Sequence, residues 1–162
     1  MKNNFVITAL PSEPFKEYFH WPATKLSAQG MSLIQADAFP GYPCRVSLED
    51  AQIGEDVLLV NYTHHQIDGA YRSNGPIFIR KDAFKAQLSP GEIPQIIKHR
   101  RNLSLRCYSG GGNMIDCRIC HGDQVAPVLN ELFEDQNIAY IHIHNAAPGC
   151  FNCEVKRAQE LC

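Results

Sequence analysis

The chain has 162 residues, of which 44% are hydrophobic and 20% are charged, and its formal net charge is −2. These values are typical of one soluble globular domain with a hydrophobic core. The nearly balanced charge favours neither a nucleic acid nor a membrane surface as partner. The first apolar run, residues 5–10, is too short for a signal peptide or a membrane-spanning helix, so we expect a cytoplasmic protein.

Residues 1–101 contain more predicted strands than helices. Apolar runs predict strands at residues 5–10, 31–36, 56–62 and 76–80. Ser12 is a candidate N-cap for a short helix ending at Phe19. A second short helix is expected from Pro94 to Arg101, because proline is favoured in the first helical turn.

Residues 63–75 form the longest polar connection in the chain. Loops of this length inside a compact domain are often functional. This loop is therefore a candidate for lining a small-ligand pocket, and an ordinary polar connection is the plain alternative. Its candidate pocket residues are His64, His65, Tyr71 and Arg72.

The C-terminal third of the sequence is predicted to form two strands, then a helix, then two further strands. Alternating apolar residues indicate strands at 103–108 and 115–119, with a Gly-rich reversal between them. An apolar face repeating every three to four residues indicates a helix over 125–133, with Asp123 as its cap. Strands follow at 138–144 and 151–156. We predict a single α+β domain over residues 1–162, built mainly on an antiparallel sheet with a few short helices.

Two histidines and two cysteines gather in residues 140–153, which read Y-I-H-I-H-N-A-A-P-G-C-F-N-C. Side chains alternate along a strand, so Ala139, Ile141 and Ile143 are expected to face the core. Tyr140, His142 and His144 then share the opposite face. The Cα atoms of the two histidines should lie about 6.8 Å apart, close enough for both rings to reach one metal ion.

The predicted hairpin register extends this polar face. If residues 145–149 form the loop, His144 lies opposite Cys150, and directly opposite residues share a face. Cys150, Asn152 and Glu154 would then join the histidines. Phe151, Cys153 and Val155 would join the core, because a one-residue slip would bury the polar side chains instead.

Two metal-site geometries follow from this hairpin. A flat site would use His142, His144 and Cys150 and leave a coordination position open. A closed structural site would use Cys150 and Cys153 if the backbone bends to bring them together. Its preferred distant donor is Cys44, followed by His64 or His65. A hairpin with a polar histidine face and no ligand is the plain alternative.

Two other motifs resemble functional sites but are predicted to have structural roles only. Cys117, Cys120 and His121 match the C-x-x-C-H pattern of covalent haem attachment, but that attachment requires export, so no covalent haem is expected. Cys117 is instead predicted to be a small core residue. The basic run at residues 98–101 is typical of the solvated end of a helix, and we do not expect nucleic-acid binding.

Three segments, residues 41–51, 71–80 and 141–153, resemble the bacterial DUF1203 family of unknown function. The resemblance implies a single-domain cytoplasmic protein and brings no activity with it. Relatives often carry a second cysteine where this chain has Ser47, and the resemblance then implies a four-cysteine zinc site in those relatives. This chain keeps Cys44, Cys150 and Cys153, so either a histidine supplies the fourth ligand or the site is lost.

Three hypotheses for function remain open. The first is a zinc-binding protein that uses the ligands Cys44, Cys150, Cys153, His144 and His142. The second is a metal-free module that binds a small ligand or a protein through the loop at residues 63–75. The third is a thiol-dependent enzyme with Cys150 as nucleophile and His144 as base.

Overall fold

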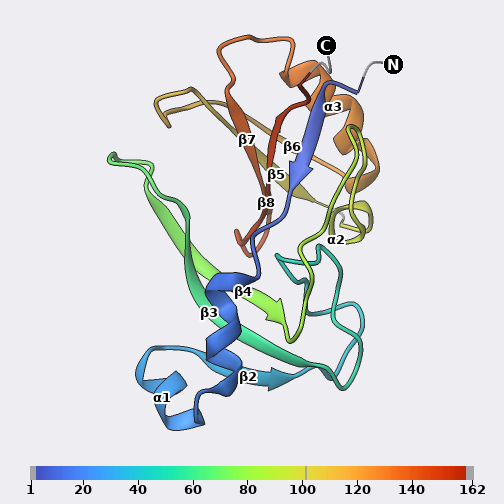
Figure 1. The fold of residues 1–162 in the computed structure, drawn as a ribbon. Coiled ribbons are helices and arrows are strands. Elements are labelled where there is room, and N and C mark those ends of the chain that lie inside the picture. The colour runs from blue at the N-terminus through green and yellow to red at the C-terminus, as the bar shows by residue number, and fades with distance from the viewer. Residues whose placement is uncertain (1–2, 101, 160–162) are drawn as a thin grey trace.

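The computed structural model describes residues 3–100 and 102–159 and contains two antiparallel sheets (Figure 1). One sheet has five strands in the order β1-β8-β7-β5-β6, and the other has three in the order β2-β3-β4. The strands are β1 (Phe5–Thr8), β2 (Ser32–Gln35), β3 (Asp56–His65), β4 (Ser73–Arg80), β5 (Leu103–Tyr108), β6 (Met114–Cys120), β7 (Tyr140–Asn145) and β8 (Phe151–Arg157).

The helices are short and connect or cover the strands. They are η1 (Glu13–His20), α1 (Ala23–Ala28), α2 (Gln95–Lys98), η2 (Gly122–Gln124) and α3 (Val125–Leu132). The predicted α+β class and the C-terminal order of strands and helix are confirmed. Ser12 and Asp123 do not act as predicted, because no side chain caps either η1 or α3 and the N-cap of α3 is Gln124. Arg101, the last residue of the helix predicted at 94–101, lies outside the described residues.

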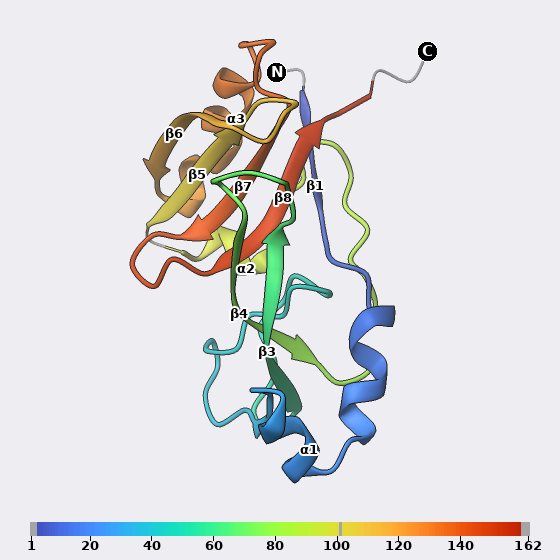
Figure 2. The same ribbon diagram turned by 90° about the vertical axis from the view of Figure 1, so that its left-hand side faces the viewer.

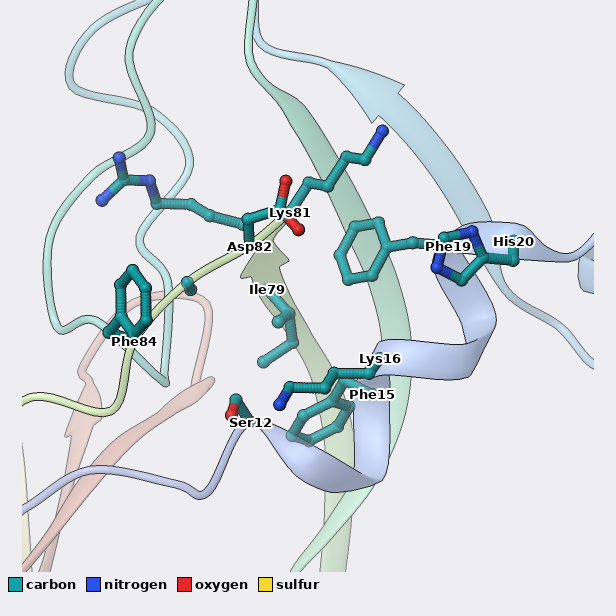
Figure 3. A pocket seen from close by; sticks show the side chains of 11 residues that line it. Ser12, Phe15, Lys16, Phe19, His20, Ile79, Lys81, Asp82 and Phe84 are labelled. Carbon is teal, nitrogen blue, oxygen red and sulfur yellow. The ribbon is translucent and has the colours of Figure 1, made fainter.

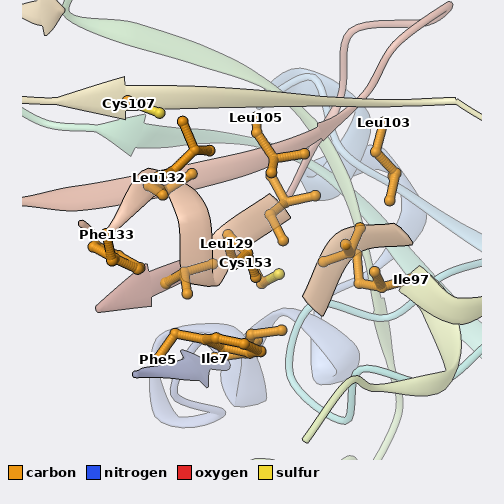
Figure 4. Close-up of a cluster of buried hydrophobic side chains, with 14 of the residues drawn as sticks. Phe5, Ile7, Ile97, Leu103, Leu105, Cys107, Leu129, Leu132, Phe133 and Cys153 are labelled. Atoms are coloured by element: carbon orange, nitrogen blue, oxygen red, sulfur yellow. The ribbon is translucent and has the colours of Figure 1, made fainter. Parts of the chain in front are cut away.

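The main core lies between the five-stranded sheet and α3 (Figure 4). Leu105, Ile141 and Ile143 are fully buried on this face and pack with Leu129 of α3. The alternation that predicted an inward apolar face for β5 and β7 is therefore confirmed, except that Ala139 lies before β7 and is exposed. We call this face of the sheet the core face and the opposite face the histidine face.

The β3–β4 hairpin is longer than predicted and crosses the histidine face (Figures 1 and 2). Residues 63–65 and 73–75, predicted as loop, instead extend these two strands. The hairpin tip packs against the turn between β5 and β6, where a Cβ atom on Gly112 would lie 2.9 Å from Ile67. Gly112 also has a φ of +81°, so both close approach and backbone conformation require glycine there.

Strand β6 forms one edge of the five-stranded sheet, and its side chains point the opposite way from the prediction. Cys107 and Leu105 of the core face lie opposite Asp116 and Arg118. Cys117 consequently lies on the histidine face and is exposed, so its assignment to the core was wrong. Within the described residues, no helix combines the length and apolar character needed to cross a membrane.

Candidate metal centre

Strand β7 presents His142 and His144 on the histidine face, as its alternation predicts. The two side chains are only 1% and 0% exposed, and their ring centroids lie 6.3 Å apart. Buried polar groups almost always have hydrogen-bond partners or bind a ligand. Two buried imidazoles on one face of the sheet therefore indicate either a hydrogen-bond network or a binding site.

An irregularity in β3 brings a third histidine to these two. The β3–β4 register shifts between Tyr62 and His65, where β3 has one extra residue relative to the facing part of β4. Such a bulge changes the direction of the side chains beside it. As a result, His64 and the adjacent His65 both contact His142, with ring centroids 6.1 and 5.2 Å away. In a regular strand, consecutive side chains would point to opposite faces.

Because of a second bulge, in β8, the observed register of the β7–β8 hairpin differs from the predicted one. His144 pairs with Phe151, not with Cys150, while Ile143 pairs with Cys153, so Asn152 is the extra residue. Phe151 therefore lies on the histidine face and not in the core, and its ring stacks on His64 with centroids 5.1 Å apart. The predicted inward position of Cys153 is confirmed by its place in the main core cluster.

His64, His142 and His144, which we call the histidine cluster, have the geometry of a metal site. Each offers a ring nitrogen, and the three nitrogens all lie within 4.8 Å of one another. Three buried nitrogens of this cluster lack a hydrogen-bond partner: Nδ1 of His64, Nδ1 of His142 and Nε2 of His144. Zinc–nitrogen bonds are about 2.0 Å long, so small side-chain adjustments would bring three such nitrogens onto one ion.

Hydrogen bonds at the remaining nitrogens orient two of the rings. His144 donates from Nδ1 to the Gly149 carbonyl at 2.9 Å, because a carbonyl only accepts. His142 pairs through Nε2 with the Glu154 carboxylate at 3.2 Å. Both partners leave the opposite nitrogen free for a metal. Carbonyl and carboxylate groups of this kind fix the orientation of ligating histidines in metalloproteins.

The surroundings keep all three rings neutral near pH 7. Burial lowers the pKa of His64 to about 4, and the nearby His142, Arg106 and His65 add to the shift. Burial lowers the pKa of His144 to about 3 against the effect of its bond to the Gly149 carbonyl. The pKa of His142 is also lowered by burial, although Glu154 opposes this. Metals bind the neutral form of imidazole, so the cluster does not have to lose protons first.

His65 is buried beside the cluster but differs from its members because both of its nitrogens are occupied. Nδ1 lies 2.7 Å from the Tyr71 carbonyl, and Nε2 lies 2.7 Å from the Tyr140 hydroxyl. Of the four predicted pocket residues, His64 joins the candidate metal site and His65 lies beside it. Tyr71 contributes its backbone, and Arg72 is exposed on the hairpin turn.

The predicted cysteine ligands lie apart from the histidine cluster. Burial lowers the pKa of the Arg45 guanidinium to about 10, and the charges of nearby Cys150, Cys44 and Cys153 oppose this effect. Among the described residues, the cysteines do not form a group of three within ligand distance of one another. Arg45 donates to the carbonyl oxygens of Phe151, at 2.7 Å, and Pro43. This arginine thus joins the segment after Pro43 to the start of β8.

Two of the cavities that the described residues line are relevant to a ligand site. One of about 330 Å³ reaches the cluster at His64 and is also lined by Tyr62, Glu154, Lys85 and Lys156. A second, of about 310 Å³, lies between η1 and the end of β4, where Phe15, Phe19 and Phe84 surround it (Figure 3). Only the first adjoins the predicted site residues.

The comparisons with known proteins identify a family but no function. Residues 41–157 match the family model described as protein of unknown function, DUF1203. The chain belongs to this family, and the resemblance is confirmed. Neither the curated proteins nor the solved structures include a match to this chain. The matched segment contains the whole histidine cluster, Glu154 and Arg45.

Proposed function

We propose that this DUF1203 protein binds a divalent transition metal, with zinc as the first choice, through His64, His142 and His144. Two observations support this: one ring nitrogen from each histidine lies within 4.8 Å of the other two, and each of the three rings has a buried nitrogen without a hydrogen-bond partner. Imidazole suits zinc among the common biological metals. Leaving three buried nitrogens unpaired would cost free energy in a site with no other use.

Three protein ligands leave a fourth position for water or a substrate. Closed structural zinc sites use four protein ligands, whereas three histidines plus a water is an arrangement found in catalytic sites. A zinc ion bound in this way lowers the pKa of its water to about 7 and can polarise a carbonyl or phosphoryl oxygen. The cavity beside His64 would provide access to the open position.

The first test is metal content and affinity. Protein purified without chelator should contain close to one equivalent of zinc by elemental analysis, and the metal-free protein should take up one equivalent in a calorimetric titration. A chain that contains no metal and takes up neither zinc nor cobalt would refute the proposal.

Replacing Glu154 with glutamine should weaken zinc binding by about 10- to 100-fold. Glu154 accepts the His142 Nε2–H and also contacts Lys156 at 3.0 Å. Burial raises its pKa, but these two partners outweigh burial and lower it overall, so Glu154 is a carboxylate near pH 7. A competition titration with a chromophoric chelator measures the change. Glu13→Gln, at an exposed site far from the cluster, is the matched control and should bind zinc as the native chain does.

The charges around the cluster favour an anion as the fourth ligand. The metal and three neutral imidazoles carry two positive charges, and Glu154 supplies one negative charge. Arg106 lies directly opposite His142 across β5 and β7. The arginine–carboxylate ion pairs among the described residues involve Arg80, Arg100 and Arg118, not Arg106. A carboxylate or phosphate bound to the metal would balance this charge.

Replacing Arg106 with glutamine should therefore weaken acetate binding to the metal-loaded protein by about tenfold. Zinc itself should still bind. Acetate can be followed by its effect on the visible spectrum of the cobalt-loaded protein, with Arg72→Gln on the exposed hairpin turn as control. Equal acetate affinity in the native and Arg106→Gln proteins would contradict an anchoring role for Arg106.

A further inference from the structure

Strand β6 is an exposed edge of the five-stranded sheet, paired on one side only among the described strands. Two of its side chains on the histidine face are exposed, Ile119 at 73% and Cys117, and Ile115 in the adjacent bulge is 43% exposed. Edge strands normally avoid exposed apolar residues because an unpaired edge can recruit another strand. This edge therefore combines free pairing capacity with apolar side chains.

The backbone of Cys117 points away from the sheet. Its N–H donates to the Asp116 carboxylate at 2.7 Å, and its carbonyl accepts from the Arg118 guanidinium at 3.0 Å. In an antiparallel ladder, alternate residues exchange hydrogen bonds with a given neighbour, so Cys117 directs its backbone groups to the free edge. Only exposed side chains satisfy these groups, and such contacts contribute little to stability.

The sequence of this strand, M-I-D-C-R-I-C, is complementary to itself when a second copy runs antiparallel. With a two-fold axis at Cys117, Asp116 lies opposite Arg118 of the second copy, and Arg118 opposite its Asp116. Ile115 likewise lies opposite the second copy's Ile119. Opposite-charge pairs across neighbouring strands are favourable, and like charges are unfavourable.

Moving the two-fold axis to a neighbouring residue of β6 would not give these complementary residue pairs. Directly opposite residues must share a face, so the axis can move only to Asp116 or Arg118. Either position would place a charge opposite its own copy. The Asp116–Arg118 contact within each of the two chains, at 2.6 Å, would be exchanged for the two such contacts between chains. The charge pattern therefore selects both the partner and the register.

We propose that β6 pairs with β6 of a second copy of this chain, forming a continuous ten-stranded sheet with a two-fold axis at Cys117. Because Ile115 is the extra residue of the bulge opposite Cys107 and Tyr108, the regular ladder is limited to residues 116–118 of each copy, and the Ile115–Ile119 pairs lie at its two ends. Stable interfaces bury about 1,200–2,000 Å², which is more than one short strand provides. The dimer is therefore reversible and depends on protein concentration, and it does not depend on metal binding.

Light scattering after size exclusion, over a range of protein concentrations, tests this dimer. The native chain should approach twice the monomer mass as concentration rises. Asp116→Arg and Arg118→Asp should each raise the dissociation constant by at least about tenfold. The double variant Asp116→Arg/Arg118→Asp should restore the dimer, because its charges are complementary again. Glu13→Lys, at another exposed ion pair, should leave the mass unchanged.

Circular dichroism should show that each variant is folded before its mass is compared. A native chain that stays monomeric at its highest soluble concentration would overturn the proposal. A dimer that persists in both single variants would also overturn it, because the interface would then lie elsewhere. Folded single variants that are monomeric, combined with a double variant that is monomeric too, would overturn the antiparallel register.

Discussion

Replacing His144 with alanine should raise the dissociation constant for zinc by about a thousandfold or more, equivalent to about 4 kcal/mol. The His144 side chain is fully buried, and its free Nε2 belongs to the cluster. Without it, the two remaining histidines cannot hold the ion against water. Competition with a chelator of known affinity gives the two constants. Zinc should also raise the unfolding temperature of the native protein and leave that of the variant unchanged.

His65→Gln is the matched control for this experiment. His65 is 3% exposed and contacts His142, but both of its nitrogens already have partners. The substitution should lower stability, because the Tyr71 and Tyr140 contacts are weakened, while zinc affinity stays close to the native value. If His65→Gln and His144→Ala reduced zinc affinity equally, the cluster would have been assigned to the wrong nitrogens.

The second large effect is expected at Arg45. Replacing it with methionine should lower the free energy of unfolding by about 2 to 3 kcal/mol. Methionine keeps most of the apolar stem but donates no hydrogen bonds, so the carbonyls of Phe151 and Pro43 would lose a charged donor. Since Arg45 is only 2% exposed, water cannot easily replace it. Urea unfolding of the metal-free protein measures the difference.

Arg72→Met is the comparison for Arg45, because Arg72 is exposed and its side chain donates a single long hydrogen bond, of 3.4 Å, within the described part of the chain. It should change the free energy of unfolding by less than about 0.5 kcal/mol. Equal stability of the Arg45→Met and native proteins would mean that the cost of burying a guanidinium offsets its hydrogen bonds. The anchoring role of Arg45 would then be contradicted.

Local periodicity was enough to predict the class of the fold and the positions of two of the three members of the histidine cluster. The two-residue repeat through Ile141, His142, Ile143 and His144 places the imidazoles on one face, because core packing selects the isoleucine face. The repeat of the α3 segment similarly identified Leu129 as a core residue. These inferences succeeded because each depends only on residues within one element.

The third histidine could not be placed from the sequence because it depends on bulges and on contacts between distant segments. The extra residue before His65 and the extra residue Asn152 each shift a register by one. The bulge in β3 brings His64 to the histidine face. The bulge in β8 places Phe151 on the same face and leaves Cys150 without a partner in the β7–β8 pairing. The adjacent histidines His64 and His65 follow the apolar run of β3 and were a signal that this strand continues. The strand was instead predicted to end at Tyr62.

The visible absorption spectrum of the cobalt-loaded protein tests most directly whether the histidine cluster is the metal site. Cobalt(II) occupies zinc sites, and its spectrum reports both the geometry and the ligand type. Coordination by His64, His142 and His144 predicts intense visible bands at one equivalent of cobalt, with no thiolate-to-cobalt charge transfer in the near ultraviolet. A strong charge-transfer band that is lost on replacing Cys44, Cys150 or Cys153 with serine would place the metal at the cysteines and contradict the account.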